Sequence, residues 1–284
     1  MFFGSGVKAQ VNLIVDPSFE LHDSCVNNLI ILGTYNWHCL DSINNTYQTT
    51  SSCSPAYLNI CNSYPLGSCP ANYGQTYSYK YPRSGNGMYI NVFYCNPVSC
   101  NTVYNRDYLR GRIRGGLING KQYCGKYYVS LYQSMKYGTD RLCAYLDNGA
   151  LDTNSPCLPI VVTPTWENPT FNYILDTAGW TAVQGVFTAN GTETYMTIGN
   201  FYSHANTHTA LFKASNTYNE SYYYVDDVSI IATDITAYAG NDVTICVSDS
   251  IHLGRPQEIG LECLWFKPYI TGICKGRCYS WFIP

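Results

Sequence analysis

The sequence predicts an all-β protein built around a β-sandwich. Tyr occurs 28 times in 284 residues, and Tyr and Thr both favour strands. Gly occurs 23 times and Pro 13 times, and together with Asn and Ser they divide the chain into short segments, as turns between strands require. No long segment has the apolar periodicity of an amphipathic helix. We therefore expect many short strands and almost no helix.

Strand candidates follow one another along most of the chain. Met88–Tyr94 is rich in aromatic and β-branched residues. Trp180–Phe187 and Thr192–Phe201 flank Asn190-Gly191, a dipeptide that favours tight hairpin turns, so we expect these two segments to pair as a hairpin. Short strands that recur between turns are typical of a sandwich. The sequence thus predicts one sandwich domain over residues 11–232.

The start of the chain predicts export. Residues 1–10 are similar to the tail of a secretory signal, and Val7-Lys8-Ala9 has the small-x-Ala form of a cleavage site. No later stretch is apolar enough to cross a membrane. We therefore expect a secreted or cell-surface protein without a transmembrane segment.

The 14 Cys residues fall into two groups. Ten lie between Cys25 and Cys157, and four lie between Cys246 and Cys278. Both counts are even, which fits two separately disulfide-bonded units in an oxidising compartment, whereas reduced buried thiols are the alternative. The sequence does not define the pairing, but Cys25–Cys61 is the first pair we expect, because both residues flank the same early region.

Composition and motifs disfavour several functional classes. Only 12% of the residues are charged and the net charge is −3, whereas a nucleic-acid-binding domain is usually basic. The chain has no Gly-x-Ser-x-Gly, phosphate-loop or His-Glu-x-x-His motif. The spacing of His204 and His208 suits a metal only on a helix, and their context predicts a loop. No pair among the 19 Asp and Glu residues is singled out for glycoside hydrolysis. We therefore expect a protein that is not an enzyme.

Two phrases near the ends of the predicted domain resemble one family. The first is Val15–Glu20, VDPSFE, and the second is Tyr222–Ile230, YYYVDDVSI. They resemble the opening and closing strands of galactose-binding-like jelly-roll domains, especially carbohydrate-binding modules of families four, nine and twenty-two. In those modules the two strands lie side by side and hold a structural calcium ion. The resemblance implies a jelly-roll β-sandwich with calcium as its cofactor.

The same resemblance assigns the side-chain ligands of the calcium to Glu20 and Asp226. Asp227 is the fallback, because neighbouring strand residues face opposite ways. Asp226 shares its face with Val228 and Ile230, which we expect to point inward, and an unpaired buried carboxylate is costly. The alternative is that Glu20 and Asp226 are solvent-facing acids at strand ends.

Further calcium ligands are expected from a glycine-rich turn. Calcium takes about six to eight oxygen ligands, and backbone carbonyls are common among them. The turn Ser84–Gly87 lets the backbone approach an ion closely because it contains two glycines. We therefore expect Ser84 and Asn86 to contribute to the site.

A series of short motifs between the two phrases resembles a second group. The series is similar to the N-terminal domain of large surface proteins of the Bacteroidetes, although the high Cys content departs from that pattern. Such proteins often end in sorting, gliding-motility or peptidoglycan-binding domains. In order, the motifs are Pro55–Cys61, Pro70–Gly74, Ser84–Tyr89, Arg106–Leu109, Gly120–Tyr123, Trp180 and Thr197–Phe201.

Residues 233–284 are predicted to form a second, incomplete unit. Ala239–Cys246 and Asp249–Gly254 resemble the first strands of an immunoglobulin-like repeat of the polycystic-kidney-disease (PKD) type, and Trp265 lies where the core Trp of the third strand is expected. The resemblance stops after Pro268, and about fifty residues are too few for a sandwich of roughly 100. We expect a truncated or frame-shifted gene end, so that domains which would attach the full-length protein to the cell surface are missing.

One predicted strand and two Trp residues are the candidate ligand-binding groups. Strand alternation places four side chains on one face, opposite Leu109 and Ile113. These four are Tyr108, Arg110, Arg112 and Arg114. Such a row of Arg suits the carboxylates or sulfates of an acidic polysaccharide, and a solvated surface face is the favoured alternative. Trp37 and Trp166 lie in loop-like contexts and are candidates for rings that stack on sugars.

Taken together, these features favour a secreted, non-enzymatic module that binds a polysaccharide or glycoconjugate for adhesion or substrate capture. The first alternative is a structural or protein-interaction sandwich with the same fold, because a fold does not determine a function. The second is a hydrolase, which would have two carboxylates facing each other across a deep cleft. For the favoured function, the glycan-binding module, we expect calcium to stabilise the domain.

Overall fold

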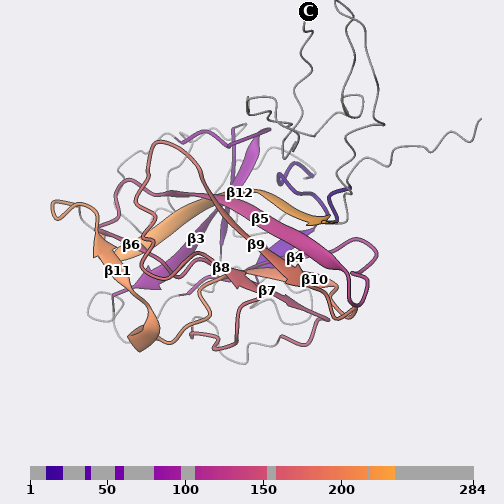
Figure 1. Cartoon of the computed structure of the whole chain (residues 1–284). Helices are drawn as coiled ribbons and strands as arrows, with labels where there is room; N and C mark the ends of the chain where they lie inside the picture. The colour runs from indigo at the N-terminus through magenta and orange to yellow at the C-terminus, as the bar shows by residue number, and fades with distance from the viewer. Residues whose placement is uncertain are drawn as a thin grey trace, which may run out of the picture. The chain divides into compact units, whose positions relative to one another are not determined.

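The structure is a computed structural model that describes residues 11–21, 36–39, 55–60, 80–96, 106–151, 158–216 and 218–233 (Figure 1). Asn12–Ile231 form one compact unit. The helical content of the described residues is one short 3₁₀ turn, η2, His204–Asn206. No helix in these ranges is long and apolar enough to span a membrane. The prediction of an all-β protein is confirmed.

Two five-stranded sheets form a jelly-roll β-sandwich, as the sequence predicts (Figure 1). The first sheet consists, in spatial order, of β1 (Trp37–Cys39), β4 (Leu109–Arg112), β10 (Tyr195–Gly199), β7 (Cys143–Asp147) and β8 (Trp166–Glu167). The second consists of β2 (Ala56–Asn59), β3 (Gly87–Cys95), β12 (Glu220–Ala232), β5 (Gln122–Leu131) and β9 (Thr181–Thr188). A separate two-stranded ribbon pairs β6 (Tyr137–Thr139) with β11 (Thr209–Leu211).

The long central strands of the second sheet carry much of the core. Strand β3 is buried at all nine positions, and β12 is buried over its first seven. Aromatic side chains dominate there because they bury a large apolar area while their hydroxyl groups still find partners. The ring of Tyr223 packs edge-on against Phe93, and its hydroxyl donates to the carbonyl of Ile174 at 2.8 Å. Tyr223 thus stabilises the core in two ways, through the packing of its ring and through the hydrogen bond of its hydroxyl.

The opening segment of the domain lies beside its closing strand, as the resemblance implies. Leu13 N–H donates to the carbonyl of Ile230 at 2.9 Å, and Val228 N–H donates to the carbonyl of Pro17 at 2.8 Å. The predicted inward face of the closing strand is also confirmed, because Val228 and Ile230 are fully buried.

The predicted hairpin over Trp180–Phe201 is wrong. Strand β9 pairs with β5 in the second sheet, whereas β10 pairs with β4 and β7 in the first. The turn at Asn190-Gly191 therefore connects the two sheets instead of closing a ribbon. Within this turn, the carboxylate of Glu193 accepts the N–H groups of both Asn190 and Gly191.

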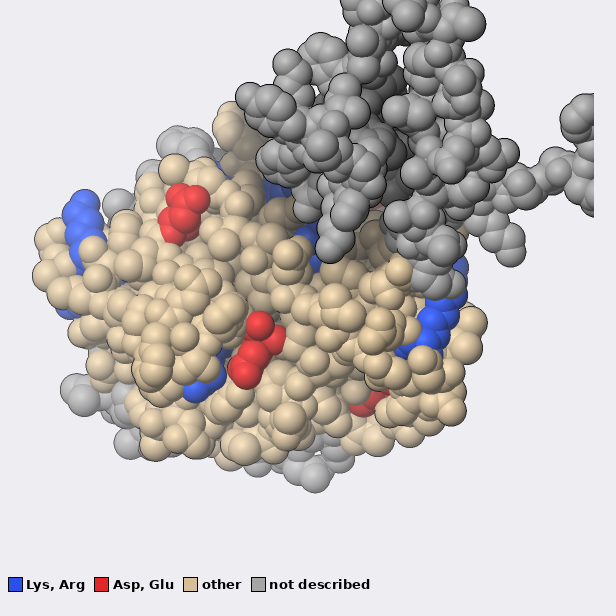
Figure 2. Space-filling model, viewed as in Figure 1, with Lys and Arg blue, Asp and Glu red and all other residues tan. Residues whose placement is uncertain are grey.

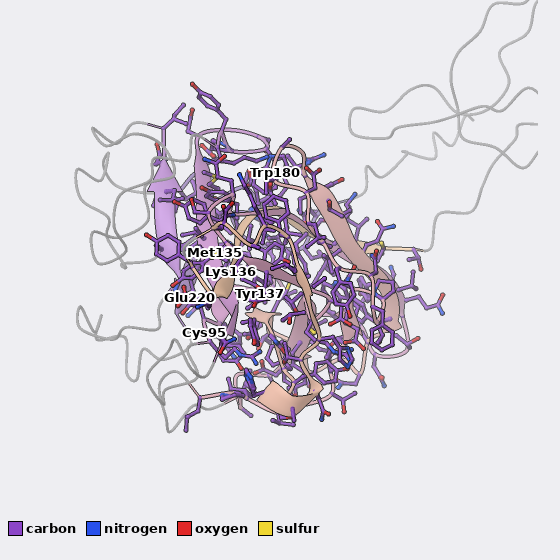
Figure 3. The ribbon with its side chains drawn as sticks, turned by 90° about the vertical axis from the view of Figure 1, so that its left-hand side faces the viewer. Cys95, Met135, Lys136, Tyr137, Trp180 and Glu220 are labelled. Carbon is purple, nitrogen blue, oxygen red and sulfur yellow. The ribbon has the colours of Figure 1, made fainter. Side chains whose placement is uncertain are left out.

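One end of the second sheet holds a buried acid. Glu220 begins β12 and is paired in register with Cys95 on β3, and only 6% of Glu220 is exposed. Figure 3 shows both residues beside Met135, Lys136 and Tyr137, whereas Trp180 lies apart from them. Burial raises the pKa of Glu220 to about 7. Its charge is therefore a source of pH dependence in the fold.

The Cys predictions are tested only in part. Cys124 and Cys143 have free thiols, and Cys143 is fully buried, so these two residues fit the alternative of reduced thiols and not the expected disulfide bonding. Burial also raises the pKa of the Cys143 thiol far above its ordinary value, which keeps it protonated. The expected Cys25–Cys61 pair lies outside the described residues, as do residues 1–10 and nearly all of the predicted immunoglobulin-like unit.

Candidate functional site

The residues predicted to hold calcium come together around the turn Arg83–Gly87. On one side of the turn, the N–H groups of Asn86 and Gly87 donate to Glu20 Oε1 at 2.7 and 2.8 Å. The carbonyl of Asn86 accepts the N–H of Ile60 at 2.9 Å, so this carbonyl belongs to the junction with β2. The turn therefore meets Glu20 with hydrogen-bond donors, whereas the sequence led us to expect carbonyl groups there.

On the other side of the turn lie the paired acids of β12. The N–H groups of Arg83 and Ser84 donate to Asp226 Oδ2 at 2.6 and 3.3 Å. The hydroxyl of Ser18 donates to Asp227 Oδ1 at 3.0 Å, and Arg83 forms an ion pair with Asp227. The turn Arg83–Gly87, the segment Asp16–Glu20 and the two β12 acids together form what we call the terminal clasp.

Asp226 is the most deeply buried acid of the terminal clasp. It is fully buried, so the alternative of a solvent-facing strand-end acid is wrong for this residue. Burial, followed by the neighbouring charge of Asp227, raises the pKa of Asp226 to about 7. Burial and the nearby acids Glu20, Asp16 and Asp226 also raise the pKa of Tyr57 to about 12. Negative charge thus accumulates in a poorly solvated place, which favours a cation.

The terminal clasp also concentrates backbone strain. Four non-glycine residues have positive φ angles in the described part of the chain, and three of them, Asp16, Phe19 and Asp227, lie in the clasp. Asp tolerates this region of conformational space, but a bulky Phe at φ 61° is strained. The Phe19 ring is fully buried against Trp37 and Tyr89, and this packing maintains the conformation.

The donor set of the clasp is only partly complete for a metal. Calcium needs several oxygen ligands, but Glu20 Oε1 and both carboxylate oxygens of Asp226 already accept backbone N–H groups. Among the residues that the structure describes, no group of three or more His, Cys, Asp or Glu side chains has the arrangement of a metal site. The buried charge of Asp226 is the feature that fits a cation best.

The predicted row, which runs from just before strand β4 to just after it, is divided between core and surface. Tyr108 and Arg110 are buried, so the expectation of a continuous solvent-facing row is wrong for them, whereas Arg112 and Arg114 are exposed. Arg110 Nη2 lies 2.7 Å from Asp147 Oδ1 on β7, across the intervening strand β10. An inner strand leaves little room for solvated charge, and a buried Arg needs such a partner.

The row therefore does not form the continuous four-residue face that the sequence predicted. The opposite face follows the prediction, because Leu109 and Ile113 are both buried. Tyr108 uses its hydroxyl internally, as it donates to the carbonyl of Asn200 at 3.0 Å and accepts the N–H of Ile160 at 2.7 Å. Arg112 remains a surface residue beside the ring of Tyr195.

Both candidate Trp residues belong to the core, so their prediction as sugar-stacking rings is wrong. Trp37 is fully buried, and its indole N–H lies 2.9 Å from the carbonyl of Asp16. Trp166 is 5% exposed and its ring is stacked on Phe187. A β-carbon added at Gly185 would lie 2.5 Å from Trp166. The sequence did contain a signal that such rings could be buried. That signal is glycine in a facing strand, because a position without a side chain makes room for a large ring.

A cluster of half-buried aromatic side chains around one exposed ring lies elsewhere, at a position that the sequence did not indicate. The ring of Phe171 is stacked on His208 with centroids 4.7 Å apart, and Tyr173 lies 6.5 Å from Phe171. We call Phe171, Tyr173, Tyr202 and His208 the aromatic patch. Phe171 is 65% exposed and has φ 64°, so a strained backbone presents a bulky ring to solvent.

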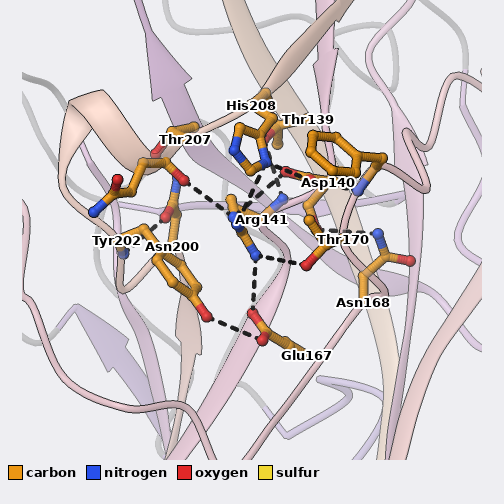
Figure 4. Close-up of polar contacts among 12 residues, drawn as sticks. Thr139, Asp140, Arg141, Glu167, Asn168, Thr170, Asn200, Tyr202, Thr207 and His208 are labelled. Atoms are coloured by element: carbon orange, nitrogen blue, oxygen red, sulfur yellow. Dashed lines mark hydrogen bonds and ion pairs between the residues drawn. The ribbon is translucent and has the colours of Figure 1, made fainter.

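A buried acid positions the stacked pair of the aromatic patch. Asp140 is fully buried, and its Oδ2 accepts the N–H of Phe171 at 2.7 Å. The same oxygen lies 2.9 Å from His208 Nδ1 (Figure 4). A proton on Nδ1 makes this contact a hydrogen bond and leaves Nε2 as the acceptor of the ring. Asp140 thus fixes both the strained backbone and the imidazole orientation.

Arg141 connects this pair to the rest of the patch (Figure 4). Its guanidinium lies over the ring of Tyr202 at 4.1 Å and donates to Thr170 Oγ1 at 3.2 Å. It also lies 3.6 Å from both Asp140 Oδ1 and Glu167 Oε2. The Tyr202 hydroxyl donates to Glu167 Oε1 at 2.9 Å. Burial and the Glu167 carboxylate raise the pKa of Tyr202 to about 12, so its hydroxyl keeps its proton.

The two His residues considered for a metal have different environments. His208 belongs to the aromatic patch, whereas the ring of His204 is stacked on Tyr94 with centroids 5.2 Å apart. The face of the molecule in Figure 2 carries isolated charged side chains separated by uncharged surface. The described residues on that face therefore form no continuous basic band of the kind that nucleic acids bind.

Comparisons with known proteins add the following. No protein-family model matches the chain, and the curated proteins include no match. The CBM22-1 xylan-binding domain of Paenibacillus barcinonensis Xyn10C aligns over 81% of this chain and 100% of its own, with 10% identity and a TM-score of 0.39. The K3 cleaved adhesin domain of Lys-gingipain from Porphyromonas gingivalis W83 aligns over 78% and 99%, with 12% identity and a TM-score of 0.36. At these TM-scores the likeness identifies no function.

Proposed function

We propose that this protein is a secreted or cell-surface module that binds a polysaccharide or glycoconjugate through the aromatic patch. One observation carries the proposal: the ring of Phe171 is 65% exposed although its backbone is strained, and a buried carboxylate maintains it there. Residues that are held in strained backbone conformations cluster at active sites, ligand-binding sites and switch regions. A strained, exposed and stacked ring pair is a suitable platform for the apolar face of a sugar.

The polar groups around the patch suit sugar hydroxyls. Ligand sites combine apolar or aromatic walls with a few fixed polar groups. His208 offers Nε2, and Glu167 is partly exposed with its carboxylate oriented by Tyr202. Thr170 and Asn172 are exposed beside Phe171. These acceptors and donors allow several hydrogen bonds to one sugar ring.

The charges of the patch favour a neutral glycan. The Arg141 side chain is 9% exposed and already pairs with Asp140 and Glu167, so it offers no spare positive charge. Glu167 is 32% exposed and carries the solvent-facing charge. An acidic sugar would place its carboxylate near another carboxylate, which is unfavourable. We therefore propose neutral polysaccharides as the ligand class, in place of the acidic polymers that the Arg row suggested.

The same contacts support a binding role over a catalytic one. Glycoside hydrolysis needs two carboxylates that face each other with the sugar or a water molecule between them. Here the guanidinium of Arg141 lies 3.6 Å from both Asp140 and Glu167 and occupies the space between these two acids. The patch thus lacks the open carboxylate pair that a retaining or inverting mechanism uses.

A glycan array tests the proposal directly. The wild type and two variants, Phe171→Ala and Tyr81→Ala, are compared on neutral and acidic polysaccharides. Tyr81 is a matched control, because it is 67% exposed and lies outside the patch. We expect binding of a neutral glycan to weaken about fivefold or more in Phe171→Ala and to stay unchanged in Tyr81→Ala, since stacking of a ring-shaped ligand on an aromatic side chain contributes on the order of 1 kcal/mol or more, as base stacking does.

The outcomes of the array separate the competing functions. Equal binding by Phe171→Ala and the wild type would show that the patch is not the site. No binding by folded wild-type protein on any glycan would favour a structural or protein-interaction domain. Hydrolysis of a bound glycan would establish an enzyme and refute the binding role.

We propose in addition that calcium stabilises the terminal clasp through Glu20 and Asp226. The supporting observation is the fully buried Asp226 beside Asp227, with Glu20 on the opposite side of the same turn. We expect the wild type to melt at a higher temperature with calcium than with a chelator. Glu20→Ala should melt at the same temperature in both, because one proposed ligand is missing.

A matched acid elsewhere controls this experiment. Asp176 is exposed and bonded to the N–H groups of Ala178 and Gly179, far from the clasp in sequence. Asp176→Asn should keep the full calcium response of the wild type. A wild type whose melting temperature is the same in calcium and in chelator would refute the calcium proposal without affecting the proposed glycan site.

A further inference from the structure

The turn that connects β9 to β10 gathers reactive groups that the proposed function does not use. Glu193 is 5% exposed, and its carboxylate accepts the N–H of Asn190 at 2.7 Å and the N–H of Gly191 at 2.9 Å. The side-chain oxygen of Asn190 accepts two donors from Thr192, the N–H at 2.9 Å and the hydroxyl at 2.7 Å. Asn190 and Gly191 themselves are exposed.

This arrangement combines a base, a nucleophile and an activated carbonyl. A backbone nitrogen becomes nucleophilic when its proton is removed, and Glu193 Oε2 is the acceptor next to the Gly191 proton. Two donors on Asn190 Oδ1 stabilise the negative charge that develops when its carbonyl carbon is attacked. We propose that Asn190 is a self-processing site, at which the folded chain converts Asn190 to Asp and isoaspartate through a cyclic imide.

The proposed reaction exchanges ammonia for water. Gly191 N forms a bond to Asn190 Cγ while the proton of this nitrogen passes to Glu193 Oε2. The proton then reaches Asn190 Nδ2, the Cγ–Nδ2 bond breaks, and ammonia leaves. Solvent water opens the five-membered imide at either carbonyl and gives Asp or isoaspartate. No group is oxidised or reduced, and the carboxylate of Glu193 is regenerated.

Glycine is essential to this site. Gly191 has φ +83°, a conformation that other residues rarely adopt. A β-carbon at this position would lie 2.9 Å from the β-carbon of Asn119. The nitrogen that attacks is therefore flanked by the smallest possible residue, and the exposed turn gives water access to the imide.

The chain contains three other Asn-Gly pairs that serve as internal standards. At Asn148-Gly149 the Gly N–H donates to Asp147 Oδ1 at 2.6 Å, but Asn148 Oδ1 accepts one donor only, the N–H of Ala150 at 3.1 Å. This pair therefore has a carboxylate base beside the Gly N–H, but only one hydrogen-bond donor on the Asn side-chain oxygen, whereas Asn190 has two. It should react more slowly than Asn190.

The remaining two pairs lack more of the arrangement. At Asn86-Gly87 the Gly N–H donates to Glu20 Oε1, and no donor from the described residues reaches the side-chain oxygen of Asn86. At Asn119-Gly120 the Gly N–H donates to a backbone carbonyl, which is a much weaker base than a carboxylate. The proposal therefore predicts a rate order of Asn190 first, then Asn148, then Asn86, with Asn119 last.

Peptide mapping by mass spectrometry of one incubated sample tests this order. The folded full-length chain is kept at neutral pH, and conversion at the four Asn residues is followed together with ammonia release. Glu193→Gln should slow conversion of Asn190 about tenfold or more, because a positioned general base contributes at least that factor, and it should leave Asn148 unchanged. In the denatured chain the four rates should become similar.

A second pair of variants keeps the test decisive if Glu193→Gln does not fold. Thr192→Val removes the hydroxyl donor and should slow Asn190 several-fold, whereas Thr192→Ser retains the donor and should react like the wild type. Asn190 that reacts no faster than Asn119 in the folded chain would overturn the proposal. So would a Glu193→Gln variant with an unchanged or faster rate, because the carboxylate would then protect the turn.

Discussion

Arg110 shows how one side chain decides the character of a strand. It is 3% exposed and lies between Asp147 and the ring of Tyr195, with a further bond to Thr197. A charge at this depth is tolerated only because an opposite charge, that of Asp147, lies beside it. The alternation of the strand predicted which residues share a face, but not that the side chains of Asp147 and Tyr195 on nearby strands would bury Arg110.

Removing the Arg110 charge should therefore be costly. Arg110→Met leaves Asp147 as a buried carboxylate without its partner, and we expect the free energy of unfolding to fall by about 3 kcal/mol. Arg112→Met is the matched control, because Arg112 is exposed on the same strand and surface substitutions change stability by about 0.5 kcal/mol or less. Urea unfolding of both variants measures the difference. Similar values for the two would show that the buried pair contributes little.

Glu220 makes stability depend on pH at the start of β12. Its pKa in the folded protein, about 7, lies above its ordinary value because of burial, so the folded state prefers the protonated acid. The associated stabilisation is complete below the ordinary pKa of a Glu and is lost as the pH rises through 7. Glu220→Gln should remove this loss.

The expected size of the effect is on the order of 2–3 kcal/mol between acid and mildly alkaline pH. Urea unfolding across that range is the measurement, and the stability of Glu220→Gln should fall less steeply with pH than that of the wild type. Glu167→Gln is the control, since Glu167 is partly exposed and lies on β8, in the other sheet. Parallel pH profiles for the wild type and Glu220→Gln would contradict this assignment.

At the scale of elements, local patterns predicted strands better than pairings. The region Met88–Tyr94 lies within β3, and alternating burial along β5 follows the expected period of two. The dipeptide Asn190-Gly191 correctly predicted a turn. It did not predict that the turn connects the two sheets, since β9 pairs with β5 and not with β10. Which strands pair is decided by contacts between distant segments, and the local sequence of a turn does not contain that information.

The aromatic patch could not be predicted for the same reason. Its four residues come from two separate connections, after β8 and after β10, and the acid that orients two of them, Asp140, comes from a third connection, after β6. Asp140 gathers Phe171 and His208 from positions 31 and 68 residues away. The terminal clasp was predictable because the resemblance supplied both of its phrases, although the hydrogen-bond donors of its turn were not foreseen.

At the scale of the whole molecule, the opening segment joins the two sheets. Val15 N–H donates to the carbonyl of Arg112, and Arg114 N–H donates to the carbonyl of Leu13, which attaches the segment to the strand region of the first sheet. Leu13 N–H donates to Ile230 of β12 in the second sheet. A few residues at the start of the domain therefore bond to both layers of the sandwich.

The side chain of Asn12 makes three hydrogen bonds at this junction. Its amide Nδ2 donates to the carbonyl of Val228 at 2.9 Å, and its Oδ1 accepts the N–H of Ile230 at 3.1 Å and of Ile14 at 3.1 Å. Asn12→Ala removes all three bonds and leaves backbone groups of β12 without this partner. We expect the free energy of unfolding to fall by about 1–3 kcal/mol.

Hydrogen exchange distinguishes this effect from a general loss of stability. The amide of Ile230 should exchange faster in Asn12→Ala, and more so than amides in the middle of β5, because only the former loses its acceptor. Gln133→Ala is the control, since Gln133 is exposed and far from the opening segment in sequence. If Asn12→Ala unfolds with the same free energy as Gln133→Ala, the opening segment does not hold the sheets together through Asn12, and the backbone bonds of Leu13, Val15 and Arg114 suffice.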